Sequence, residues 1–116
     1  KNFDDAVVSL LRSVEKKGWA VFQIYDISER LAAKGFNHSP LKIIEICSAK
    51  YANNFLNKSK LISLFMPCKI NIFEENGKVK IAAMKPTAIS QFFPNVDGES
   101  SAEVERDIID IVADSL

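Results

Sequence analysis

Two cysteines and one glutamate are the side chains with the clearest capacity for chemistry. Cys47 ends an apolar segment in which isoleucines flank Glu45, and Cys68 begins a later apolar segment. A thiolate can act as a nucleophile, bind a soft metal ion or form half of a redox pair. Free cysteine is also among the most buried residue types, so packing as a small hydrophobic side chain is an equal alternative for each thiol.

Glu45 is the most unusual polar placement in the chain. A carboxylate in an apolar strand must face water, find a cationic partner or stay protonated. Basic side chains on the same and on neighbouring predicted strands favour a structural ion pair; they are Lys42, Lys69, Lys78 and Lys80. The functional alternative is a ligand pocket that combines Glu45 with Tyr25, Cys47 and Cys68.

Other kinds of site have weaker support. A parallel crossover would hold Cys47 and Cys68 beyond the roughly 7 Å between Cα atoms that a disulfide allows, whereas an antiparallel arrangement would make them neighbours. Soft-metal binding by both thiols with Met66 is a minor alternative, but the spacing matches no standard zinc or copper pattern, so we predict no metal site. His38, the only histidine, lies in a polar turn, and the four glycines form no nucleotide-binding loop.

Composition restricts the class of protein. A chain of 116 residues with 47% hydrophobic and 26% charged residues fits one domain with one core. Its net charge of zero gives no field that would attract nucleic acid, and no apolar run approaches the roughly 20 residues that span a bilayer. With two cysteines and no recognisable leader, we expect a cytoplasmic protein that binds neither nucleic acid nor membrane.

Periodicity and turn residues predict the elements that carry these side chains. Asn76-Gly77 suits a tight hairpin between strands at 68–75 and 78–84 because both residues tolerate positive φ. Apolar stripes predict helices near both ends, the last one capped at Ser100, whereas residues 61–65 fit no element cleanly. The remaining predicted elements are a strand at 19–27, a helix at 27–34, a strand at 41–47 and a helix after Ser48.

The order (β)-α-β-α-β-α-β-β-α predicts an α+β two-layer sandwich. We expect a mixed sheet of three to four strands with helices on one face, in a single domain spanning 1–116. The first helix starts with nothing before it, which leaves room for a further strand upstream of Lys1.

Several short motifs in order resemble a known family. They are Gly18-Trp19-Ala20-Val21, Ile43-Ile44-Glu45-Ile46-Cys47, Ala49 and Ala52, Leu64-Phe65-Met66-Pro67-Cys68-Lys69-Ile70, and Pro86 after the hairpin. Over about residues 3–86 the chain resembles the bacterial and archaeal family numbered 302 among domains of unknown function. Ser48-Ala49 stands where that family often has Asn-Pro, and Met66 stands where Leu is usual. The resemblance implies an α+β fold that often associates as dimers, with no established activity.

These observations lead to three hypotheses of function. The first is a homodimeric binding or sensing module with a small-molecule pocket near Glu45 and Cys47 and no catalysis. The second is an enzyme of thiol or sulfur chemistry that uses Cys47 or Cys68, with a helix N-terminus after Cys47 favouring the thiolate. The third is a structural homodimeric subunit, for which the apolar pair Phe92-Phe93 would suit a partner surface. The identity of any cofactor is unknown from the sequence.

Overall fold

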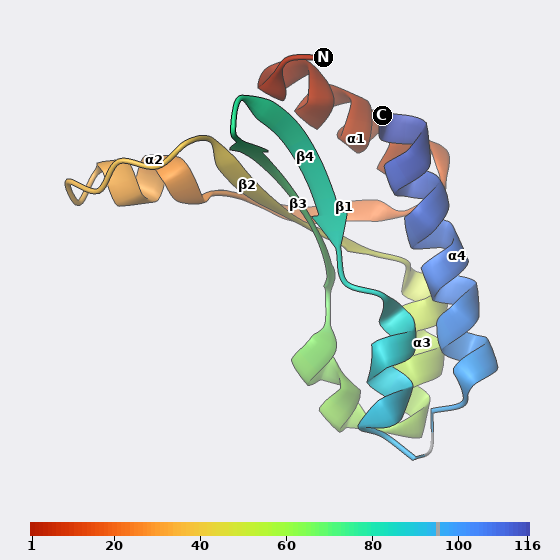
Figure 1. Ribbon diagram of the computed structural model, residues 1–116. Coiled ribbons are helices and arrows are strands. Elements are labelled where there is room, and N and C mark those ends of the chain that lie inside the picture. Colours follow the sequence, from red (N-terminus) through yellow and green to blue (C-terminus); the bar gives the residue numbers. More distant parts are fainter. Residues whose placement is uncertain (95) are drawn as a thin grey trace.

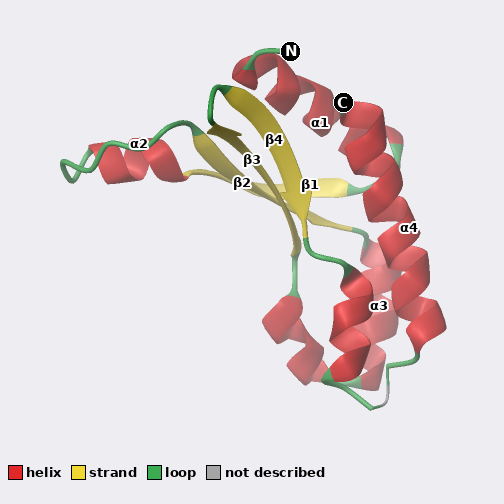
Figure 2. Cartoon of the chain, in the orientation of Figure 1, coloured by secondary structure: helices red, strands yellow, loops and turns green. Residues whose placement is uncertain are grey.

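Four strands form one sheet, and helices cover one of its faces (Figures 1 and 2). The computed structural model describes residues 1–94 and 96–116, without the side chain of Ile89. The strands run in the order β1-β2-β3-β4, and each neighbouring pair is antiparallel. The predicted α+β two-layer class is confirmed, but the strands are antiparallel throughout the described residues rather than mixed. In chain order the elements are α1 (Phe3–Lys16), β1 (Ala20–Asp26), α2 (Ile27–Ala32), β2 (Leu41–Cys47), α3 (Ala49–Lys58), η1 (Lys60–Phe65), β3 (Cys68–Glu75), β4 (Lys78–Ala83), η2 (Pro86–Gln91) and α4 (Gly98–Ser115).

The covered face of the sheet forms the core with α1 and α4. Its fully buried isoleucines are Ile44, Ile46, Ile70 and Ile72. Strand alternation and the register of β2 with β3 place these four side chains on one side. Each contributes about 1.5–3 kcal/mol by leaving water. A buried hydrogen bond of 2.7 Å, from Ser13 Oγ to the carbonyl oxygen of Ile111, joins the two covering helices.

The other face of the sheet is open, and the strand register decides which side chains share it. Opposite residues in an antiparallel pair point to the same side. One row across the strands contains Gln23, Glu45 and Lys69, and the next contains Tyr25, Ile43, Asn71 and Ala82. Polar side chains from three strands therefore gather on this open face.

The hairpin between β3 and β4 is confirmed at the predicted residues. Asn76 has φ +54° and Gly77 has φ +75°, which is the two-residue turn with both central residues at positive φ. Beyond β4 the chain turns away from the sheet toward η2, which takes Met84 and Pro86 to the end of the sheet where β3 begins.

Three details differ from the sequence predictions. The sequence of β1 predicts simple alternation, with Val21, Gln23 and Tyr25 on one face. A bulge at Phe22 instead brings Val21 opposite Ile46 and interrupts that alternation. Helix α4 is capped by Asp97, which accepts a hydrogen bond from the backbone N–H of Ser100, and so it begins before the predicted cap at Ser100. The unassigned residues 61–65 form part of η1, a 3-10 helix.

The segment around α2 projects from the sheet as an arm (Figure 1). None of the residues in α2 is buried. The spacing of Asp26 and Glu29 predicts a capping box at the start of this helix, and the side chain of Asp26 accepts from the N–H of Glu29 at 2.9 Å. No helix among the described residues is long and apolar enough to cross a membrane.

Candidate ligand groove

Tyr25 and Glu45 form a pair on the open face. The hydroxyl of Tyr25 donates to Oε1 of Glu45 at 2.8 Å, and the guanidinium of Arg30 lies 5.3 Å from the centre of the tyrosine ring. The hydrogen bond to Glu45 raises the pKa of Tyr25, because it holds the phenolic proton. Lys69 is the β3 neighbour of Glu45, yet no ion pair joins them in the described part of the chain. The carboxylate therefore has a neutral partner instead of the lysine that the sequence favoured.

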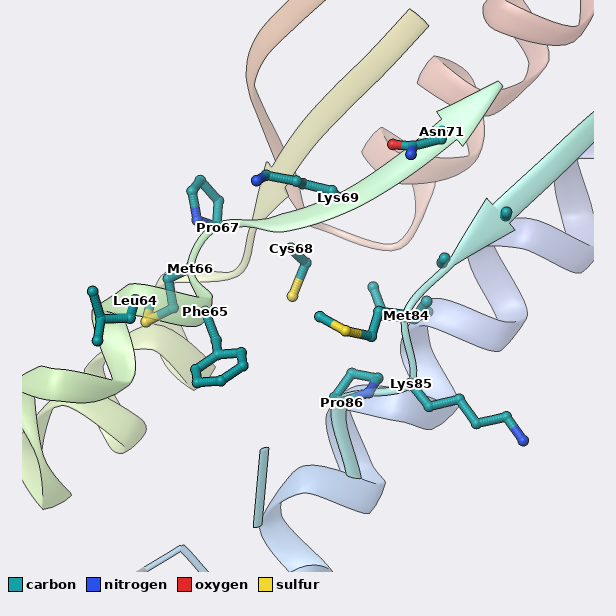
Figure 3. A pocket seen from close by; sticks show the side chains of 13 residues that line it. Leu64, Phe65, Met66, Pro67, Cys68, Lys69, Asn71, Met84, Lys85 and Pro86 are labelled. Carbon is teal, nitrogen blue, oxygen red and sulfur yellow. The ribbon is translucent and has the colours of Figure 1, made fainter. Parts of the chain in front are cut away.

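A groove lies where the start of β3 and the segment after β4 diverge (Figure 3). Its volume is about 320 Å³, within the usual range for small-ligand sites. One wall comes from η1 and the turn into β3, and the other comes from the segment after β4. The side chains that define it are Phe65, Met66, Cys68, Asn71, Ala82, Met84 and Pro86, with Lys69 and Lys85 at the rim.

Phe65 is held in place by two aromatic neighbours. Its ring stacks on Phe92 with centres 5.7 Å apart, and it meets the edge of Phe93 at 5.7 Å. Phe92 remains 66% exposed, whereas Phe93 packs against the core. Such aromatic contacts stabilise beyond area burial alone, so this wall of the groove is fixed by the fold.

Asn71 supplies a hydrogen-bonding group without a partner. Its Oδ1 is buried and accepts no hydrogen bond from any described residue. Buried polar atoms in folded proteins almost always have a partner, and leaving one unpaired costs about 1–3 kcal/mol. Asn71 is one of the residues that line the groove.

Both thiols are free, and burial controls their ionisation. Burial, with a smaller effect from Cys47, raises the pKa of Cys68 to about 11. Burial also raises the pKa of Cys47. Both side chains are therefore protonated at neutral pH, since burial outweighs any effect of the α3 N-terminus.

A narrow apolar crevice lies behind the groove. It has a volume of about 30 Å³ and is lined by Trp19, Cys47 and Phe55 among others, while Cys68 and Met66 line both spaces. The indole N–H of Trp19 donates to Asp107 at 2.9 Å, which fixes this wall to α4. Cys68 thus stands between the open groove and the closed core.

A family model for a domain of unknown function, DUF302, matches residues 1–115. The chain belongs to the DUF302 family. The DUF302 chain is also similar to the crystal structure of an uncharacterized conserved DUF302 protein from Bacillus stearothermophilus. That similarity has a TM-score of 0.92 and 27% identity, and it covers 100% of this chain and 92% of the other. The chain matches none of the curated proteins with which it was compared.

The DUF302 fold brings the four predicted site residues together as two pairs. Tyr25 and Glu45 are hydrogen-bonded on the open face. Cys47 and Cys68 both line the crevice, in the antiparallel arrangement that makes them neighbours. Of the four, Cys68 lines the groove.

The sequence-based site included only Cys68 from the groove lining, and it missed Asn71 and Met84. The position of Asn71 between two buried isoleucines of β3 was a usable signal, because alternation sends it to the open face. Met84 lies beyond the end of β4, where no periodicity applies.

Proposed function

We propose that this DUF302 chain is a non-catalytic binding module that holds a small organic molecule in the groove. The supporting observation is a groove of about 320 Å³ whose lining includes Asn71, the residue with the buried and unpartnered Oδ1. The ligand would place an apolar body against Phe65 and Met84 and donate an N–H or O–H group to Asn71. Tyr25 and Glu45 would contact any part that extends along the open face, with Cys68 at the inner wall and Cys47 behind it.

The protonation of the thiols favours binding over thiol chemistry. Nucleophilic cysteines need a lowered pKa because the thiolate is the reactive form. Burial moves the pKa of both thiols in the opposite direction. A thiol enzyme built on this site would have to overcome the desolvation of the buried thiolate in every catalytic cycle.

A fluorescent probe tests the binding proposal. N-phenyl-1-naphthylamine has an apolar body of suitable size and one N–H donor, and its emission increases in apolar surroundings. We expect saturable binding that Ala82→Trp abolishes, because Ala82 lines the groove and the indole would fill it. Lys80→Trp is the matched control, since Lys80 lies on the same face of β4 but outside the groove lining.

Asn71→Leu tests the hydrogen bond separately. Loss of the acceptor removes about 1 kcal/mol, so the probe should bind about fivefold more weakly. The same probe methylated on nitrogen has no N–H, and we expect it to bind both proteins equally. Unsaturable binding, or equal binding by the Ala82→Trp protein, would contradict the proposal.

We propose homodimerisation through β1 as a second property. Residues 20–25 of this edge strand carry no charge, and Val21, Phe22 and Ile24 are exposed. The opposite edge, β4, carries Lys78 and Lys80, which protect it from pairing. The radius of gyration of 15.2 Å exceeds the roughly 13 Å expected for a compact chain of this length. This is in keeping with the projecting arm around α2, which would contact the second copy in the dimer.

Two exposed phenylalanines provide a matched test of the dimer. Phe22 is 60% exposed on β1, and Phe92 is 66% exposed far from it in the sequence. Sedimentation velocity should show a dimer that Phe22→Lys converts to monomer and Phe92→Lys leaves intact. A monomeric wild-type protein would contradict the dimer. Dissociation by Phe92→Lys alone would place the interface near Phe92 instead of on β1.

A cytoplasmic location is part of the same proposal. Both thiols are free although they are neighbours, which suits a reducing compartment. Labelling of intact and permeabilised cells with antibody against the chain would test this location.

A further inference from the structure

Every sulfur-containing side chain of the protein lies in one region. The sequence contains two cysteines and two methionines. Cys68, Met66 and Met84 line the groove, and Cys47 lines the crevice directly behind it. The residues come from the end of β2, the turn into β3 and the segment after β4, so the fold and not sequence proximity gathers them.

Figure 3 shows how the three groove side chains lie. The sulfur atoms of Cys68 and Met84 are directed toward one another across the groove. The thioether of Met66 is directed toward Leu64. Met66 has an unbranched side chain with several rotatable bonds, so a change of rotamer can turn its sulfur toward the groove.

We propose that Cys68, Met84 and Met66 form a binding site for a soft monovalent metal ion, copper(I). Thiolate and thioether ligands are soft and favour copper(I), whereas carboxylate ligands suit harder ions such as magnesium and calcium. In the described residues, no three side chains among His, Cys, Asp and Glu come together as a harder site would require. On binding, the Sγ–H bond of Cys68 breaks, the proton leaves to solvent and an Sγ–Cu bond forms, so the thiolate neutralises the ion.

This site differs from the sequence-based expectation of no metal. The spacing of Cys47, Met66 and Cys68 matches no copper pattern because the missing ligand, Met84, follows the hairpin. The β3–β4 hairpin returns the chain to the start of β3 and supplies that ligand. The proposed copper(I) site is independent of the organic ligand, since it depends on the sulfur atoms and not on Asn71.

Anaerobic titration against the copper(I) chelator bicinchoninate tests the site on the whole chain. We expect one copper(I) per chain and no comparable binding of zinc(II). Met84→Leu keeps the apolar volume and removes the sulfur, and Met84 is 65% exposed, so the fold should survive. Loss of a residue that only supports a metal ligand typically weakens metal binding by roughly tenfold or more. Loss of the Met84 sulfur should weaken copper(I) binding by at least that factor, and Cys68→Ser should weaken it further.

Cys47→Ser is the matched thiol control. Cys47 lies behind the groove, so the dissociation constant of this variant for copper(I) should stay within about threefold of the wild-type value. That change is smaller than the roughly tenfold effect of losing a residue that only supports a metal ligand. Methyl resonances of both methionines should shift on addition of copper(I). Binding that survives Cys68→Ser and Met84→Leu, or that only Cys47→Ser abolishes, would overturn the proposed ligands. Absence of competition with the chelator would overturn the site while leaving the probe-binding result unaffected.

Discussion

The rate at which iodoacetamide alkylates Cys68 should depend on pH in an unusual way. Burial raises the pKa of this thiol to about 11 from the ordinary value of 9.0. Alkylation requires the thiolate, so its rate follows the ionised fraction. With a pKa of about 11, that fraction rises about 90-fold between pH 8 and pH 10, whereas an ordinary thiol with a pKa near 9 gains only about tenfold.

Pulsed labelling followed by peptide mapping gives this ratio for each cysteine. Lys50, Lys58 and Lys60 lie between the two thiols, so trypsin separates them into different peptides. The ratio of rates at two pH values is insensitive to the intrinsic nucleophilicity of the thiolate, which makes it a clean measure of ionisation. Labelling in urea provides the control, because in the unfolded chain the ratio of alkylation rates at pH 10 and pH 8 should fall to the about tenfold of an ordinary thiol.

Two outcomes would refute this reasoning. A plateau between pH 8 and 9 for Cys68 would mean that burial does not control its ionisation. A titration midpoint below 8 would show an activated thiolate, and would revive the thiol-enzyme hypothesis in place of the binding module.

The remaining predictions concern stability. The folded state holds the Cys68 proton more tightly than the unfolded state does, so the protonated thiol stabilises the fold. This contribution to the free energy of unfolding is complete below about pH 9. It is lost as pH rises through about 11, at a cost of up to about 2–3 kcal/mol that Cys68→Ser should abolish in urea titrations. Ile70→Ala should cost about 2–5 kcal/mol because the side chain is fully buried, whereas Leu64→Ala, at a site 78% exposed, should change the free energy of unfolding by under about 0.5 kcal/mol. Gly77→Ala should destabilise by about 1 kcal/mol because its φ is +75°, and Gly98→Ala, without positive φ and with open space around the added Cβ, should not; equal effects would contradict the turn assignment.

Local sequence signals predicted the sheet well because they depend on neighbouring residues. Asn76-Gly77 specified the hairpin, since few other dipeptides accept two positive φ angles. Alternation assigned Ile44 and Ile70 to the covered face, where both are fully buried. The bulge at Phe22 escaped prediction because an extra residue in an edge strand leaves the apolar pattern almost unchanged.

The site was predicted only in part, because its parts meet through tertiary contacts. Tyr25 and Glu45 were grouped together from strand alternation, and the register then joins them by a hydrogen bond. The lysine partner expected for Glu45 was not found among the described residues. In this register the neutral hydroxyl of Tyr25 is the hydrogen-bond partner of the carboxylate. No periodicity could place Met84 opposite Cys68, because that meeting depends on where the chain turns after β4.

The most direct test of the binding module is a two-dimensional amide NMR titration with N-phenyl-1-naphthylamine. We predict saturable shifts in the backbone amides of residues 64–66, 68–69 and 82–85 and in the side-chain amide of Asn71, with little change along β1. Shifts spread over β1, or an unperturbed Asn71 side chain at saturation, would contradict a ligand in this groove.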